Sequence, residues 1–486
     1  MPLLWRAATS FDTGTFVIGE AFGSALFNSA VVAFTVMFTA LVVGLPIGVL
    51  AALYHVPGKK PVLMLVALPL LVPSFLWAIG WSALAARWGR TASEVLSGFA
   101  GCIIVFSATG IPLVLLTAFI VTIGLSASQV EAARLAGGEQ VVFRQALRHA
   151  AQPALLAASL AGVLTLSDPG PGLIFGLRSA ASDILTSFSA LYDFGQAGQQ
   201  CVVLAGVVLL VATPLAYFAA PWLATQVMPR QLLAEIPVRH RSSGFAAIAA
   251  LTILVAFGIL LPVAGISLPV IEADAEFERS LSEVGRTWAN TLIYALGAGA
   301  MAALLGFLLA FFVGRSTRLR TVCLGICIAL FSLPPALAAL GLVQLAGDAE
   351  AWMDPLLRSR LTVCLALGLR LFPVAAVLGF QAWAATSSSW NWAGAIHGVP
   401  LTKYLRKVVL PFVSPTLALA VFLVGLLATA DVGTVLLLHP PGQESFPLAI
   451  FTVMANAPES LAASLCVLYV VAAGGLLILV ARFLNI

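Results

Sequence analysis

Residues 24 to 54 read SALFNSAVVAFTVMFTALVVGLPIGVLAALY, an apolar run that contains no charged side chain. A helix needs about 20 consecutive, mainly apolar residues to span a bilayer, so this run is long enough to cross a membrane. Similar runs recur along the 486-residue chain, which is 61% apolar and only 9% charged. A typical soluble protein is about a quarter charged. The sequence therefore predicts an all-α, polytopic membrane protein.

The apolar runs and the polar segments between them predict about eleven transmembrane helices. No basic tract is long enough to follow a nucleic acid backbone, so nucleic acid is not an expected partner. The six cysteines lie inside apolar runs and form no CxxC pair, which indicates neither disulfides nor a metal site. The predicted spans are 24–54, 62–86, 98–126, 150–168, 199–223, 245–271, 288–314, 321–346, 360–384, 411–437 and 461–483.

Basic residues are distributed unevenly between the two sides of this predicted topology. The loops on one side hold fifteen of the 24 Lys and Arg residues, and the opposite loops hold eight. Cytoplasmic loops carry such an excess of positive charge. We therefore expect the amino terminus to lie outside and the carboxyl terminus, after Arg482, to lie in the cytoplasm. An acidic outer loop is expected at residues 272–283. It suits a cationic substrate or a basic surface of a binding protein, but a solvated surface explains it more simply.

The chain also contains an internal repeat with an offset of about 262 residues. This offset aligns Asn28 with Asn290, and it aligns the sequence Asp-Pro-Gly that starts at Asp168 with Asp-Val-Gly at Asp431. Chance similarity between apolar segments would not keep polar residues and glycines in one order. The repeat predicts two homologous, parallel halves with a pathway between them: residues 1–235 with five spans and residues 236–486 with six. The span 245–271 has no counterpart in the first half.

Each half has one loop, on the predicted cytoplasmic side, with a similar short motif. Alanine favours helix and glycine permits a sharp turn, so each loop is predicted to be a short helix that ends in a turn. An amphipathic connector lying on the lipid surface is an alternative. The motif residues are Glu131, Ala132, Ala133 and Gly137 near 128–150, and Trp392, Ala393, Gly394, Gly398, Leu410 and Pro411 near 389–411.

These loops resemble the EAA motif of ABC-importer permeases, which reads Glu-Ala-Ala, three residues, Gly, and later an aliphatic residue, any residue, Leu and Pro. Over nearly its whole length the chain resembles the fused permeases of binding-protein-dependent importers, in which both halves form one polypeptide. Two departures from the motif are Trp392 in place of the glutamate and Ala150 in place of the proline. We therefore expect the two loops to bind their partner with different strength.

The resemblance implies a type I importer in the bacterial inner membrane. An extracytoplasmic substrate-binding protein would deliver the substrate, and two copies of an ATPase subunit would dock on the two cytoplasmic loops. The motif residues above would then couple ATP hydrolysis to transport. The fused arrangement is typical of the ferric-iron and thiamine groups, so ferric iron is the first expected substrate and thiamine the second.

The chain shows no sign of an active site of its own. It has no Gly-x-x-x-x-Gly-Lys-Ser/Thr phosphate loop, and its five histidines have no metal-ligand spacing. We expect neither an enzyme nor a bound cofactor or metal. A rival hypothesis is an ion-coupled secondary transporter, which would need paired ionisable residues in the middle of the membrane.

Three charged residues are candidates for lining a transport pathway: Asp168, Arg370 and Asp431. The two aspartates fall at equivalent positions of the repeat, in segments whose glycines and prolines also favour a simple turn. Arg370 lies near the middle of the span 360–384, where a charge facing lipid is costly. We expect it to face the protein interior, held by Asp431 or by carbonyls freed at Pro373, in a packing role or a pathway role.

Overall fold

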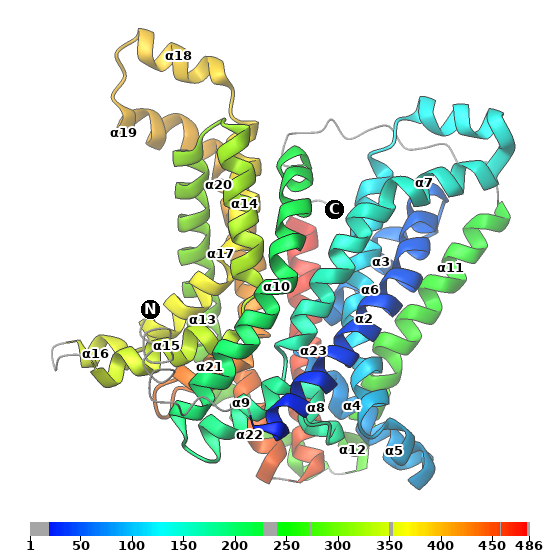
Figure 1. Ribbon diagram of the computed structural model, residues 1–486, viewed down its shortest axis with the longest axis vertical. Helices are drawn as coiled ribbons and strands as arrows, with labels where there is room; N and C mark the ends of the chain where they lie inside the picture. Colours follow the sequence, from blue (N-terminus) through cyan, green and yellow to red (C-terminus); the bar gives the residue numbers. More distant parts are fainter. Residues whose placement is uncertain (1–18, 227–240, 273, 349–352, 457, 484–486) are drawn as a thin grey trace. The chain divides into compact units, whose positions relative to one another are not determined.

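The computed structural model describes residues 19–226, 241–272, 274–348, 353–456 and 458–483 (Figure 1). Within these ranges every regular element is a helix, which confirms the all-α prediction. The helices up to residue 226 are α2 (Glu20–Leu53), α3 (Lys59–Ala67), η1 (Leu68–Leu70), α4 (Ser74–Trp88), α5 (Arg90–Leu96), α6 (Phe99–Ile123), α7 (Ala127–Leu166), α8 (Gly170–Phe175), α9 (Ala180–Ser189) and α10 (Phe194–Gln226).

The remaining helices begin at residue 241. They are α11 (Arg241–Val255), the π-helix η2 (Ala256–Leu260), α12 (Leu261–Glu272), α13 (Asp274–Val313), α14 (Thr317–Ser332), α15 (Pro335–Asp348), α16 (Asp354–Leu357), α17 (Arg360–Ala385), α18 (Ser388–Ile396), α19 (Leu401–Tyr404), the π-helix η3 (Leu405–Val409), α20 (Leu410–Thr429), α21 (Val432–Leu438), α22 (Phe446–Asn456) and α23 (Glu459–Phe483).

The described residues contain 9 helices that are long and apolar enough to cross a membrane, or up to 11 spans when two bent pairs are included. This agrees with the predicted number of spans. The bent pairs fall where the spans 62–86 and 321–346 were predicted, and they bend by 95° at Pro73 and by 81° at Pro334. Proline lacks an amide hydrogen and disfavours helix at the preceding residue, which accounts for both breaks.

Two local predictions were wrong, and a third was incomplete. Residues 274–283 of the expected outer loop are helical, because α13 already begins at Asp274. The predicted span 411–437 ends at Thr429, where Asp431 starts the separate helix α21. Asp168 makes the expected turn, since the Gly170 amide donates to Asp168 Oδ1, but Gly170–Phe175 then form the short helix α8, which was not predicted.

Chain contacts divide the protein into two compact units, here called unit 1 (Met1–Val211, Leu232–Thr287 and Phe446–Ile486) and unit 2 (Ala212–Gln231 and Trp288–Ser445). Each unit takes segments from both predicted halves. The units are defined by contacts and the halves by a sequence repeat, so the division at residue 235 stays a prediction.

In unit 1 the helices α2, α6 and α7 pack closely around small side chains. A Cβ atom at Gly48 would overlap the backbone oxygen of Leu115, so α2 and α6 approach each other at backbone distance. At Gly162 of α7, an added Cβ would lie 3.1 Å from the backbone oxygen of Ala33 in α2. Small residues allow this close packing between helices that lipid surrounds.

In unit 2 the helices α13, α17 and α20 pack in the same manner. A Cβ at Gly379 of α17 would overlap the backbone of Gly306 in α13. A Cβ at Gly299 of α13 would overlap the backbone oxygen of Val421 in α20. The apolar core at one end of these helices contains Phe380, Trp383 and Tyr404.

The predicted sidedness can be tested with introduced cysteines. Ser282 on α13 and Thr402 on α19 are both exposed. In intact cells, a membrane-impermeant maleimide should label Ser282→Cys, and it should label Thr402→Cys only after the membrane is opened. Ser280→Cys is the matched control, because this side chain is fully buried on the same helix as Ser282 and should resist labelling. Labelling of both exposed sites in intact cells would contradict the predicted orientation.

Candidate functional site

The first motif loop begins with a short, well-capped helix. Ser126 and Gln129 form a capping box: the Gln129 amide donates to Ser126 Oγ at 3.3 Å, and the Ser126 amide donates to Gln129 Oε1 at 3.2 Å. This arrangement satisfies two amides at the start of α7. Glu131 and Ala132 are exposed, whereas Ala133 is buried. The helix thus packs on one face and leaves the Glu131 face open.

A pair of glycines ends this short helix. Gly138 has φ +71° and ψ −163°, a conformation that only glycine adopts readily. Gly137 has φ −178°, which is ordinary extended backbone. The sequence prediction that Gly137 makes the turn was therefore wrong by one position, although the predicted break in the chain is present.

Polar contacts hold the two sides of this turn together. Arg134 lies before the turn and Glu139 after it, and their side chains form an ion pair at 2.6 Å. The hydroxyl of Tyr54, at the end of α2, donates to the other oxygen of Glu139 at 3.1 Å. The turn is therefore closed by its own ion pair and attached through Tyr54 to the end of α2, which limits its independent movement.

The second motif loop lies in unit 2 and is more exposed. None of the residues of α18 is buried. The side chains of Trp392 and Ile396 are 71% and 79% exposed. Exposed apolar groups gathered on one short helix are typical of a protein interaction surface. Ala393 is exposed and Gly394 half-buried on the same helix.

The second loop ends in a left-handed glycine, as predicted. Gly398 has φ +61°, and the following amide of Val399 donates back to the Gly394 carbonyl at 2.9 Å. This is a common helix C-terminal cap, in which glycine avoids the steric cost of a Cβ. Leu410 and Pro411 follow in the first turn of α20, and both are exposed.

Side chains from neighbouring helices also anchor this second loop. A guanidinium nitrogen of Arg315, just after α13, donates to the carbonyl of Thr386 at the end of α17. The rings of Trp390 and Phe412 meet edge to face with centroids 5.0 Å apart. The start of the loop is thus connected to the segment that follows α13, and Trp390 of the loop is connected to α20.

In unit 1 the carboxylate of Asp168 links two helices. Ser74 Oγ donates to Asp168 Oδ2 at 2.6 Å, and the amide of Gly170 donates to Asp168 Oδ1 at 2.9 Å. Ser74 is the first residue of α4, directly after the break at Pro73. Asp168 therefore holds the start of α8 and the start of α4 together.

In unit 2 the carboxylate of Asp431 forms a buried ion pair with Arg370. The Asp431 side chain is 4% exposed and that of Arg370 is 19% exposed. Asp431 also caps α21, because it accepts from the Thr434 amide at 3.0 Å and from Thr434 Oγ1 at 2.9 Å. The predicted partnership of Arg370 with Asp431 is confirmed.

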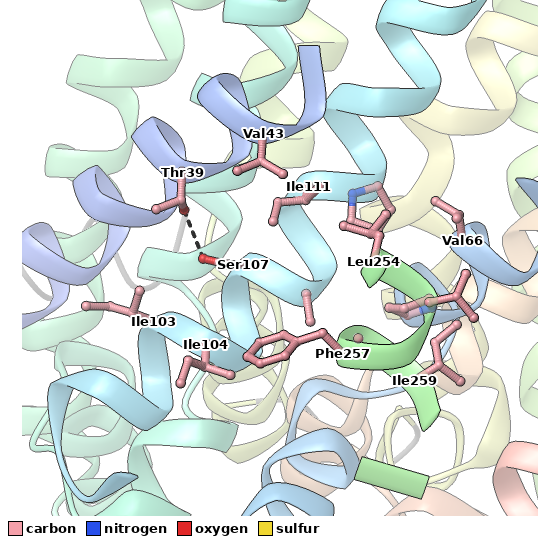
Figure 2. A pocket seen from close by; sticks show the side chains of 15 residues that line it. Thr39, Val43, Val66, Ile103, Ile104, Ser107, Ile111, Leu254, Phe257 and Ile259 are labelled. Carbon is pink, nitrogen blue, oxygen red and sulfur yellow. Dashed lines mark hydrogen bonds between the residues drawn. The ribbon is translucent and has the colours of Figure 1, made fainter. Parts of the chain in front are cut away.

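A cavity of about 290 Å³ lies in unit 1 between α2, η1, α6 and the π-helix η2 (Figure 2). Its lining is apolar apart from Thr39 and Ser107, whose hydroxyls hydrogen-bond to each other at 2.9 Å. Its lining contains no charged side chain. Because a cationic cargo needs polar or anionic groups, this cavity does not suit one.

The structure brings together only some of the residues that the sequence singled out. Arg370 and Asp431 are in contact, while Asp168 makes its contacts within unit 1. Sequence reasoning missed Gly138 and Ser74. The adjacent glycine was the only signal for Gly138, and the position after Pro73 was the only signal for Ser74. Among the described residues, no group of three or more His, Cys, Asp and Glu side chains could hold a metal ion.

No protein-family model matches the chain, and no curated protein matches it.

Proposed function

We propose that this chain is the translocation subunit of an ATP-driven importer, a fused permease of the ABC type. The observation that carries this proposal is the pair of motif loops. Each consists of a short helix with an exposed surface, a glycine with positive φ, and a long helix that follows. Such a loop offers a partner a small docking surface and leads directly into a helix long enough to cross the membrane.

The order of helices supports the proposal that two similar halves form the permease. α2, a bent pair, α5, α6 and α7 are followed by the short helices α8 and α9. α13, a bent pair, α16, α17 and the α18–α20 segment are followed by the short helices α21 and α22. The described elements therefore repeat in type and order at about the offset found in the sequence.

One side-chain contact repeats as well. Asn28 Nδ2 donates to the carbonyl of Arg178 at 3.1 Å, just before α9. Asn290 Nδ2 donates to the carbonyl of Glu444 at 3.2 Å, just before α22. Two asparagines that the sequence alignment pairs thus make the same bond in their own units, which favours common ancestry of the two halves.

The proposed transport cycle uses these parts in a simple way. A pair of ATPase subunits docks on the two loops from the cytoplasm, and their closure on ATP moves the loops. The long helices carry this movement through the membrane, so that the pathway opens alternately to each side. Substrate arrives on an external binding protein. We favour ferric iron as the substrate and thiamine as the next candidate, because the fused permeases that the chain resembles belong typically to these groups.

One observation favours the rival proposal of an ion-coupled secondary transporter. Arg370 and Asp431 form a buried ion pair whose arginine lies within a candidate span. Ionisable residues inside a membrane often mark ion or proton pathways. This transporter would work without an ATPase, so the two proposals differ in their partners.

Purification from native membranes tests the proposed function. An affinity-tagged chain, extracted in mild detergent, should carry with it an ATPase subunit with a phosphate-binding loop, in a ratio of two ATPase subunits to one chain. The complex should hydrolyse MgATP. Transport by reconstituted chain without any such subunit, driven by an ion gradient, would instead establish the secondary transporter.

The exposed face of α18 provides a sharper test of where the ATPase docks. Ile396→Glu places a charge on this face, so we expect loss of the co-purifying ATPase together with normal amounts of folded chain. Val95→Glu on α5 is the matched control, because Val95 is 70% exposed and lies outside both loops. Full retention of the ATPase by Ile396→Glu would exclude α18 from the docking surface.

A further inference from the structure

We propose that Asp168 and Asp431 are positioning residues for energy coupling. Each ties the far end of a loop-bearing helix to another helix of its unit: Asp168 through Ser74 to α4, and Asp431 through Arg370 to α17. The inference rests on the proposed function, because only a chain that an ATPase moves has a movement to transmit. Neither aspartate then needs to touch the transported substrate.

The long helices connect the loops to these aspartates. After the turn at Gly138, α7 continues to Leu166, which at about 1.5 Å per residue is roughly 40 Å. In unit 2, α19, η3 and α20 form a continuous helix from Leu401 to Thr429. Both lengths exceed the roughly 30 Å of a bilayer core. Displacement of a loop therefore reaches Asp168 or Asp431 at the opposite end of its helix.

In unit 1 the tie at Asp168 leads to the break in the bent pair. Hydrogen bonds to a carboxylate are stronger than those between neutral groups, and Ser74 makes one at 2.6 Å. The start of α8 also packs tightly against the start of α4. A Cβ added to Gly170 would lie 3.0 Å from both Phe75 Cβ and Ser74 Oγ. The end of α7, the start of α8 and the start of α4 must therefore move together.

In unit 2 the tie at Asp431 uses a different partner at the equivalent place. Its carboxylate caps α21 and pairs with Arg370 in the middle of α17. The first turn of α21 lies against α15, since a Cβ at Gly433 would lie 3.7 Å from Pro335 Cβ. Pro335 is the first residue after the second break. Both units thus place an aspartate beside the bend of a broken span.

The hydrogen bonds of Asp431 indicate that its carboxylate connects two helices and does not bind substrate. A carboxylate has about four acceptor positions. Asp431 already accepts from the Thr434 amide, from Thr434 Oγ1 and from Arg370. A cargo that bound this carboxylate would have to displace bonds on which the start of α21 depends.

A distance measurement within unit 1 tests the tie without knowledge of the substrate. Spin labels at Ala86→Cys on α4 and Gln145→Cys on α7 are both at exposed positions. Cys323, which is the one cysteine of the six that is only partly buried, is replaced by serine to avoid background labelling. The complex with its co-purified ATPase is compared without nucleotide and after trapping with ATP and vanadate. Because Asp168 makes α7 and α4 move together, we expect the distance between the two labels to be the same in both states.

Two variants of Ser74 separate the tie from general packing. Ser74→Ala removes the hydroxyl but leaves the Gly170 bond to Asp168, so the ATPase should still bind and hydrolyse ATP, but the distance between the labels should now differ between the two states. Ser74→Thr keeps a hydroxyl and should keep this distance constant. A distance that changes in the unaltered complex with trapped nucleotide, or that stays constant in Ser74→Ala, would overturn the tie. Failure of the unaltered chain to bind any ATPase would contradict the proposed function itself.

Discussion

Gly138→Ala is expected to weaken docking of the ATPase on the first loop, whereas Gly137→Ala, one residue earlier, is expected to be tolerated. At φ +71° and ψ −163° an added Cβ forces the backbone out of its observed conformation. Strain of this kind costs about 1–3 kcal/mol. If the loop must keep this shape to bind, affinity for the ATPase should fall by about 5- to 150-fold.

The neighbouring glycine is a close control for this prediction. Gly137 has an extended φ that any residue can adopt, so an added Cβ brings no positive-φ strain, although Val141 Cγ2, 2.5 Å from that Cβ, has to shift. In unit 2 the corresponding pair of variants is Gly398→Ala and Gly394→Ala. Gly398 has φ +61°, so its alanine variant is strained, whereas the Cβ of Gly394→Ala would make an ordinary contact 3.5 Å from the Tyr404 ring. Gly394→Ala also restores the alanine of the motif.

The measurement for both pairs is the amount of ATPase that co-purifies with equal amounts of monodisperse chain. MgATP hydrolysis by the complex gives a second readout. Equal ATPase binding by Gly138→Ala and Gly137→Ala would show that the left-handed turn has no part in docking. Loss of the folded chain itself in Gly138→Ala would instead assign the turn to folding.

Arg370→Gln is expected to lower the thermal stability of the chain strongly, because it leaves the Asp431 carboxylate buried without its cation. Removing one partner of a buried ion pair typically costs about 3–5 kcal/mol. Asp431→Asn should be at least as harmful, since it removes the helix-capping charge as well. The melting temperature of the purified chain in one detergent is the measurement.

The double variant Arg370→Gln with Asp431→Asn shows whether the charges are coupled. Both charges are then absent, so its destabilisation should be smaller than the sum of the two single effects. Arg90→Gln is a control, because the Arg90–Glu94 pair is 91% and 62% exposed and such pairs contribute little. Additive effects in the double variant would show that the pair is not a unit. Wild-type stability of Arg370→Gln would place the guanidinium away from Asp431.

The sequence alone was sufficient for the class of fold and for most of the spans. Apolar runs longer than a bilayer is thick have few alternatives to helix, because lipid offers no partner for an unpaired backbone group. The bends at Pro73 and Pro334 were also within reach of sequence reasoning, since proline restricts the residue before it. The short helices α8 and α21 were not, because six or seven residues carry too weak a periodic pattern.

The details of the candidate site depended on the tertiary structure. Adjacent glycines look alike in sequence, and only the path of the chain around Arg134 and Glu139 determines that Gly138 takes the left-handed turn. Ser74 and Asp168 are 94 residues apart, and Arg370 and Asp431 are 61 residues apart. The helical pattern shows that polar side chains inside the membrane need hydrogen-bond or ion-pair partners. It does not show which partners, because every polar group within reach of the helix face is equally compatible with the local sequence. Only the packing of the helices decides this.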